Sequence, residues 1–230
     1  MYKIAIVDEE MDDIRRFQLY VHKNDPEKKF NVLPFPPVPD PNELVQNIFD
    51  AGVDAIVSDF RLNEFKSNIT YTGVMLVNII LKRRQEFPCF VLTSFDDDAA
   101  KQSNDVNIVY IKNIMSGVVG DAKFTFINRI EQQILKYRSK IEQSKEVLNE
   151  LIATKKERLL NPDEEEKFIE LSHFLDSTMV GQESLPRVFY TNDTNERLNS
   201  LINLTDELLK KLDKKDESTI KRKNATKKKK

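Results

Sequence analysis

The stretch KIAIVDEE (residues 3–10) begins with an apolar run and ends in three acids. The run from Lys3 to Val7 is typical of a parallel strand that is buried on both faces. From Glu10 to about Asn24, apolar residues recur every three or four positions, which predicts a helix. A buried strand followed directly by an amphipathic helix indicates the first unit of an α/β fold.

The same alternation of strand and helix continues to residue 112. We expect four more strands, at residues 30–33, 54–58, 89–93 and 108–112. Helices are expected to begin at Asp40-Pro41 and at Thr72-Gly73, and a short acidic helix is expected between the last two strands. The segment 34–41 contains five prolines and is predicted to be irregular. This order of elements implies a parallel sheet with helices on both faces.

The sequence changes character after Gly120. Residues 121–160 contain no proline or glycine, and apolar residues recur there with a seven-residue period that only Ser144 interrupts. This pattern predicts a long helix with a coiled-coil seam, which forms either an intramolecular helical core, the commoner case, or the contact in a homodimer. We therefore expect three parts. They are a domain at 1–120, an all-α extension at 121–213 with later helices at 162–176 and 193–213, and a basic, disordered tail at 214–230.

Charge and composition exclude several classes of protein. The net charge is −2, but the last ten residues contain seven lysines and arginines and no acid, so residues 1–220 carry −9. The acidic body and the absence of a helix-turn-helix or winged-helix pattern predict no sequence-specific nucleic-acid binding. No segment approaches the ~20 apolar residues that span a bilayer. One cysteine, Cys89, excludes an internal disulfide, and we expect a cytoplasmic protein that does not enter membranes.

Reactive side chains follow four of the expected strands. Three acids follow the first strand, Asp59 ends the third, Thr93-Ser94 ends the fourth and Lys112 ends the fifth. The carboxyl ends of parallel strands meet at one edge of a sheet, so these side chains should lie together. Neighbouring carboxylates repel one another and need a cation, and oxygen ligands without histidine or cysteine favour Mg²⁺. A carboxylate beside Mg²⁺ and a lysine can attack a phosphoryl group in line.

These strand ends resemble the receiver domain of two-component response regulators. The matching segments are IAIVDEE, AIVSDFRL, FVLTS and VYIK, which occur in the family's order and spacing within residues 1–120. The resemblance implies a flavodoxin-like, doubly wound, five-stranded domain that a sensor histidine kinase or a phosphotransfer protein phosphorylates. It also implies a role for each site residue. These roles are Mg²⁺ binding by Asp8, Glu9, Asp59 and the backbone carbonyl of Arg61, phosphoacceptance by Asp59, a switch hydroxyl at Thr93 and an ion-pair partner at Lys112.

Four features depart from the family pattern. Glu9 replaces the usual aspartate, Asn113 replaces the usual proline, and Tyr110 lies one place later than the usual switch aromatic. The loop between Asp59 and Gly73 is also longer than usual. Two functions therefore remain open, neither of them enzymatic. The first is phosphorylation-dependent signalling, with output by association of the helical extension with a downstream protein or a second copy. The second is a pseudo-receiver that binds a partner without phosphorylation, in which Asp59 is an ordinary strand-end acid.

Overall fold

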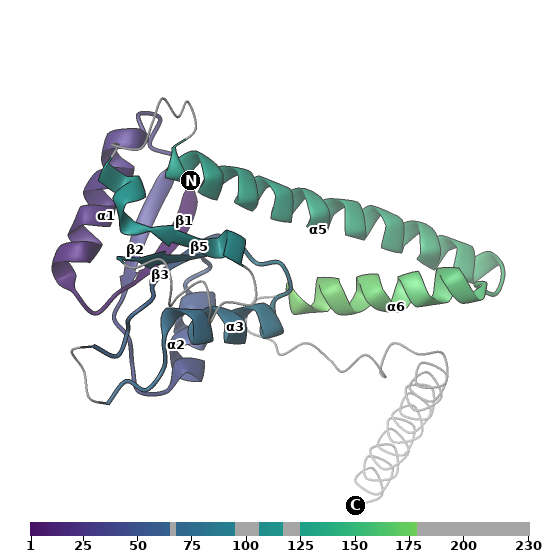
Figure 1. Cartoon of the computed structure of the whole chain (residues 1–230). Helices are drawn as coiled ribbons and strands as arrows, with labels where there is room; N and C mark the ends of the chain where they lie inside the picture. The colour runs from purple at the N-terminus through teal and green to yellow at the C-terminus, as the bar shows by residue number, and fades with distance from the viewer. Residues whose placement is uncertain (65–67, 95–105, 117–124, 179–230) are drawn as a thin grey trace, which may run out of the picture. The chain divides into compact units, whose positions relative to one another are not determined.

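The computed structural model describes residues 1–64, 68–94, 106–116 and 125–178. Its centre is a five-stranded, all-parallel sheet in the order β2-β1-β3-β4-β5 (Figure 1). The strands are β1 (Tyr2–Val7), β2 (Phe30–Phe35), β3 (Ala55–Asp59), β4 (Cys89–Thr93) and β5 (Val109–Ile111). Short 3-10 helices precede and follow β5, η1 (Val106–Ile108) and η2 (Lys112–Ser116). The strand order reverses between β1 and β3, so the predicted flavodoxin-like, doubly wound α/β fold is confirmed.

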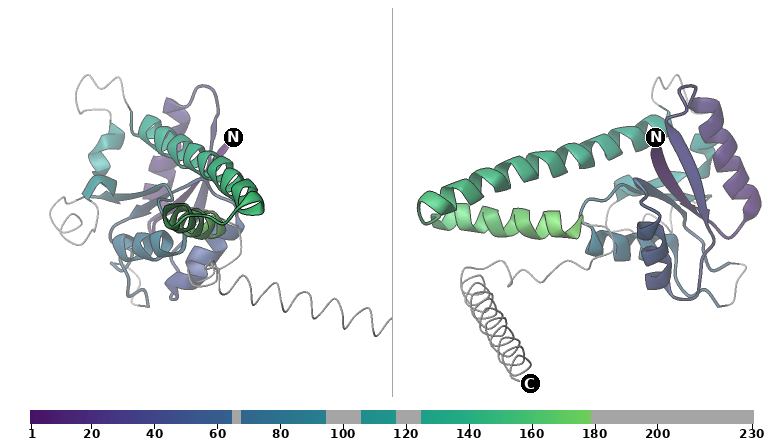
Figure 2. Two further views of the ribbon diagram at one scale, coloured as in Figure 1. Left: turned by 90° about the vertical axis from the view of Figure 1, so that its right-hand side faces the viewer. Right: turned by 180° about the vertical axis from the view of Figure 1, so that it is seen from behind.

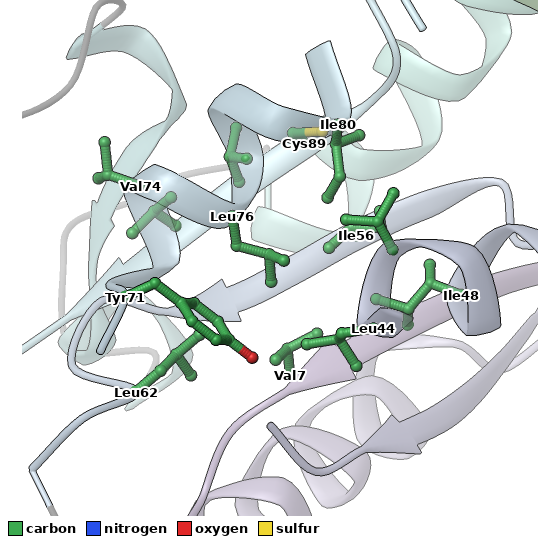
Figure 3. Packing of buried hydrophobic residues seen from close by; sticks show 14 of the residues in the cluster. Val7, Leu44, Ile48, Ile56, Leu62, Tyr71, Val74, Leu76, Ile80 and Cys89 are labelled. Atoms are coloured by element: carbon green, nitrogen blue, oxygen red, sulfur yellow. The ribbon is translucent and has the colours of Figure 1, made fainter. Parts of the chain in front are cut away.

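Helices cover both faces of the sheet (Figure 2). On one face lie α1 (Met11–Asn24) and the first part of α5 (Phe126–Glu157), and on the other lie α2 (Pro41–Asp50) and α3 (Gly73–Arg83). Each layer buries its own apolar core. Figure 3 shows the core under α2 and α3, in which labelled side chains converge from β1, β3, β4, both helices and the loop before α3: Val7, Leu44, Ile48, Ile56, Leu62, Tyr71, Val74, Leu76, Ile80 and Cys89. Because β3 and β4 are covered on both sides, every residue of these two strands is buried, as their continuous apolar runs predict.

The predicted helix starts are confirmed by their caps. The Asp40 side chain accepts a hydrogen bond from the backbone N–H of Asn42, and the Thr72 side chain accepts one from Met75. These bonds satisfy backbone donors that have no partner within the helix. At the other end of α2, Gly52 has a φ of 64°, which reverses the chain before β3.

Four of the five predicted strands differ in their bounds from the structure, β1 and β3 by no more than one residue at either end, and β2 and β5 in ways that have a physical reason. β2 continues through Pro34 to Phe35, so the prediction that all of 34–41 is irregular was wrong at its first two residues. Pro34 pairs with Ile6 in an edge strand, where a residue without a backbone N–H is tolerated on the open side. β5 is shorter than predicted, because Lys112 begins η2 instead of ending the strand.

After the sheet, the chain forms a helical hairpin, whose first arm is the long helix that the seven-residue period predicts. α5 runs unbroken over 32 residues, and α6 (Pro162–Ser177) folds back along it (Figure 1). The two helices are antiparallel, since Tyr137 packs on Phe174 and Lys155 lies over the ring of Phe168. The turn between them is closed by a capping box, in which Asn161 and Glu164 exchange side-chain-to-backbone hydrogen bonds. The first part of the extension is therefore a compact pair of helices.

Aromatic side chains join this hairpin to the sheet domain. The ring of Phe87, just before β4, packs between Phe49 of α2 and Tyr137 of α5, with centroid separations of 5.7 and 5.6 Å. Tyr137 in turn packs edge-on against Phe174 of α6 at 6.4 Å. Such pairs stabilise by about 0.5–1.5 kcal/mol each beyond their buried area. This contact lies at the amino ends of the strands, the edge opposite Asp59.

Some predictions fall on residues outside the described ranges. They are the acidic helix before β5, the helix at 193–213 and the tail at 214–230. The long helix begins later than the expected residue 121, at Phe126, where the Thr125 side chain caps it by accepting a hydrogen bond from the backbone N–H of Asn128. None of the helices in the described ranges has the length and hydrophobicity that crossing a membrane requires. The cytoplasmic location stays a prediction.

Candidate functional site

The expected cluster forms at the carboxyl edge of the sheet. A cavity of about 120 Å³ is lined by every residue to which the sequence assigned a role, together with several neighbours. The lining consists of Asp8, Glu9, Glu10, Asp13, Asp59, Phe60, Arg61, Glu64, Thr93, Ser94 and Lys112. These residues come from the ends of β1, β3, β4 and β5 and from the first turn of α1, because parallel strands present their carboxyl ends to one side.

Asp59 is held from two sides. Its side chain is 10% exposed, Oδ1 lies 2.7 Å from Lys112 Nζ, and Oδ2 accepts the backbone N–H of Arg61 at 2.8 Å. Its own carbonyl accepts a hydrogen bond from the Ser58 hydroxyl at 3.0 Å. Gly73 packs directly against this carbonyl, and a β-carbon there would lie 2.0 Å from the oxygen. Both the side chain and the backbone of Asp59 are therefore fixed by contacts with neighbouring residues.

The acidic pair after β1 lies in two different environments. Asp8 is buried, and its Oδ1 accepts the backbone N–H of Glu10 at 2.9 Å. Burial is the main reason that the pKa of Asp8 rises to about 6, although the bond from Glu10 and the charge of Lys112 oppose the rise. Glu9 is directed toward the long loop after β3, where its Oε1 accepts the backbone N–H of Glu64 at 3.0 Å.

Lys112 lies among three aspartates. Its Nζ is 2.5 Å from Asp13 Oδ2, 2.7 Å from Asp59 Oδ1 and 3.5 Å from Asp8 Oδ2, and its side chain is 15% exposed. Burial alone would lower the pKa of Lys112. The hydrogen bonds from its ammonium to Asp13 and Asp59 and the nearby negative charges outweigh burial and raise the pKa above its ordinary value. Lys112 therefore stays a cation at the centre of the acidic cluster.

Asp13 contacts Lys112 but was not predicted from the sequence, and Phe60 and Glu64, which also line the cavity, were not predicted either. Asp13 lies in the first turn of α1, where acids are common because they favour a helix amino end, so its identity alone carried little information. Its position was nevertheless informative. Asp13 lies in the first turn of the helix that follows β1 almost directly, so the sequence already placed it near the carboxyl edge of the sheet.

The residues of the expected conformational switch occupy two faces of the sheet. Thr93 is 2% exposed and lines the cavity. Val109 packs in the core under α2 and α3, whereas Tyr110 packs on the opposite face, against Phe90 and Phe126. Successive residues of a strand face opposite sides, so the aromatic at position 110 packs on the face of the sheet away from Val109. The bond before Asn113 is trans, as are all peptide bonds of the described residues.

The oxygen donors of the cluster suit Mg²⁺, but their side chains do not converge on a single metal position. Asp8, Glu9, Asp59 and Arg61 line the same cavity with oxygen donors only, and the acids outnumber the single lysine. Within the described residues, however, no group of three or more histidine, cysteine or acidic side chains is arranged to hold a metal ion. The Lys112 ammonium, 3.5 Å from Asp8 Oδ2 and 2.7 Å from Asp59 Oδ1, already offsets part of the negative charge of these two carboxylates.

This arrangement brings a carboxylate and a fixed ammonium together in a small polar cavity. Such a pair can receive a group that carries negative charge, because the cation offsets charge that the acceptor gains. The cavity brings together all of the site residues that the sequence predicted and adds Asp13 to them.

A scan of the chain against protein-family models finds no match, and a search of curated proteins finds no significant relative.

Proposed function

We propose that this chain is a receiver-type signalling protein in which Asp59 accepts a phosphoryl group from a phosphohistidine of a sensor histidine kinase or a phosphotransfer protein. The observation that supports this function best is the 2.7 Å ion pair between Lys112 Nζ and Asp59 Oδ1 at the carboxyl edge of the sheet. In doubly wound sheets this edge is where ligands bind. The strand-end segments that resemble a receiver domain all contribute residues to the cavity around this pair.

In the proposed reaction, a carboxylate oxygen of Asp59 attacks the phosphorus atom. The bond between phosphorus and the histidine nitrogen breaks, and the nitrogen leaves with the bonding electrons. Lys112 offsets the negative charge of the transferring group, and Asp59 becomes an acyl phosphate that water later hydrolyses. Mg²⁺, for which Asp8, Glu9, Asp59 and the Arg61 carbonyl are the proposed ligands, would neutralise further charge on the phosphoryl oxygens.

Intact-mass measurement tests this function directly. Incubation with a small phosphodonor such as acetyl phosphate and Mg²⁺ should add one phosphoryl group to the wild-type chain. Asp59→Asn should take none, and Asp50→Asn, an exposed acid of α2, should behave as the wild type. The proposal fails if the wild type takes no phosphate from either a small donor or its cognate kinase, or if Asp59→Asn is phosphorylated equally.

One observation favours a second function, a pseudo-receiver that binds a partner without being phosphorylated. Both carboxylate oxygens of Asp59 are already engaged, and the described acids do not converge as a metal site. Mg²⁺ titration separates the two functions, because a receiver should bind the ion in a way that Asp8→Asn weakens. A pseudo-receiver should show no binding that depends on Asp8.

We also propose that the output is protein–protein association through the helical extension. Tyr110, two residues before Lys112, packs on Phe126 at the start of α5 with the ring centroids 5.1 Å apart. A shift of Lys112 toward a phosphoryl group can therefore change how α5 packs. Light scattering and partner pull-down should differ between the phosphorylated and unphosphorylated chain, as a monomer–dimer change or as altered partner affinity. Identical results in both states would contradict this output.

A further inference from the structure

We propose that Asp13 is a positioning residue that holds Lys112 at the phosphoacceptor. This inference rests on the proposed function of Asp59 and adds a residue for which the resemblance to receiver domains supplied no role. Its basis is the geometry of the lysine, whose ammonium is hydrogen-bonded to both Asp13 and Asp59 and lies further from Asp8.

The position of Asp13 suits it to anchor a cation. Oδ2 contacts Lys112 Nζ at 2.5 Å, and Oδ1 lies 2.9 Å from a guanidinium nitrogen of Arg16, so both oxygens are engaged. The side chain is 13% exposed, whereas the side chain of the preceding Asp12 is 83% exposed and pairs only loosely with Arg15 at 3.6 Å. Asp13 is thus a fixed carboxylate that faces the site.

The proposed chemistry needs such an anchor. When Asp59 becomes an acyl phosphate, its oxygen forms a bond to phosphorus and the negative charge moves to the phosphoryl oxygens. A lysine held by Asp59 alone would lose its partner during this step. Asp13 takes no part in bond formation, so its charge is unchanged and Lys112 remains beside the transferring group. Asp8 cannot serve equally well, because its Oδ2 is 3.5 Å from the ammonium.

The rate of phosphorylation tests the inference with a matched control. Asp13→Asn and Asp12→Asn change the charge equally at adjacent positions of α1, but only Asp13 contacts Lys112. With acetyl phosphate and Mg²⁺, Asp13→Asn should slow phosphorylation of Asp59 about tenfold or more, as loss of a group that orients a reacting side chain commonly does. Asp12→Asn should stay within about twofold of the wild type. In a Lys112→Met background, Asp13→Asn should have little further effect, because the cation that it positions is gone.

A second measurement does not depend on phosphorylation. Labelling of Lys112 by an amine-directed reagent at fixed pH, followed by peptide mass spectrometry, should be several-fold faster in Asp13→Asn than in the wild type or Asp12→Asn. Circular dichroism confirms that each variant is folded. Equal labelling in all three chains, or equal phosphorylation rates, would overturn the inference. If the wild type takes no phosphate, the proposed function fails, and the labelling comparison still decides whether Asp13 holds Lys112.

Discussion

Gly73→Ala tests whether the backbone of α3 positions Asp59. The structure gives the size of the perturbation. A β-carbon at residue 73 would lie 2.0 Å from the Asp59 carbonyl oxygen, about 1.4 Å closer than the 3.4 Å at which ordinary contacts begin. It would also lie 2.7 Å from the Ser58 hydroxyl oxygen and 2.9 Å from the Asp59 carbonyl carbon. Two of these three atoms belong to the backbone, so relief requires the end of β3 or the start of α3 to move.

The expected cost follows from two opposing effects. Overpacking of this kind typically destabilises by about 1–3 kcal/mol, and replacing a helical glycine by alanine recovers roughly 0.5–1 kcal/mol. A net loss of about 1–2 kcal/mol corresponds to a fall in Tm of roughly 2–8 °C for a chain of this size. Because the moving atoms belong to Asp59, the distance from its carboxylate to Lys112 should also change, and phosphorylation by acetyl phosphate should slow.

Gly52→Ala provides the matched control. Gly52 has a φ of 64°, so alanine there is strained by about 1–2 kcal/mol, but the nearest group is the Lys3 ammonium, 3.9 Å from the added carbon. Thermal unfolding and phosphorylation rates should therefore separate the two variants. Both should lose stability, and only Gly73→Ala should lose phosphorylation rate. A Gly73→Ala chain with wild-type stability and wild-type rate would refute the argument that contact with Gly73 positions Asp59.

Two further predictions concern buried polar groups. Folding raises the pKa of Asp8 from 3.8 to about 6, so the folded chain binds a proton on this carboxylate more tightly than the unfolded chain does. Protonated Asp8 therefore contributes to the free energy of unfolding below pH 4, and this contribution is lost as the pH rises through 6. The Asp8→Asn variant should not show this loss and should be more stable than the wild type at pH 7 by up to roughly 3 kcal/mol, as measured by urea unfolding from pH 4 to 7 without divalent ions. Identical pH profiles of stability for the two chains would contradict this prediction. The Tyr137 hydroxyl is buried and has no hydrogen-bond partner among the described residues, so Tyr137→Phe should be neutral or stabilise by about 1 kcal/mol. Tyr137→Ala should lower the free energy of unfolding by roughly 2–3 kcal/mol, because it removes the ring between Phe87 and Phe174. Equal unfolding midpoints for Tyr137→Phe and Tyr137→Ala would show that this ring does not stabilise the contact between the hairpin and the sheet domain.

Local patterns predicted most of the fold. Continuous apolar runs identified the central strands, since strands covered on both faces need apolar residues throughout. Cap residues located the starts of α2 and α3 to the residue. The proline segment was predicted wrongly at residues 34 and 35, because whether a proline is tolerated in a strand depends on its place at the sheet edge. That place is a property of the whole sheet.

The sequence by itself determined which side chains reach the carboxyl edge of the sheet. Strand ends are local features, and parallel strands necessarily present them to one side, so Asp8, Asp59, Thr93 and Lys112 could be placed together in advance. Only the tertiary structure decided what each group contacts. Three contacts depend on distances between elements: the sharing of the Lys112 ammonium between two aspartates, the approach of Gly73 to the Asp59 carbonyl, and the packing of Tyr137 between Phe87 and Phe174. Helix and strand patterns specify which face of an element is buried, but not the residue of another element that lies opposite, because that choice depends on close packing of the whole core.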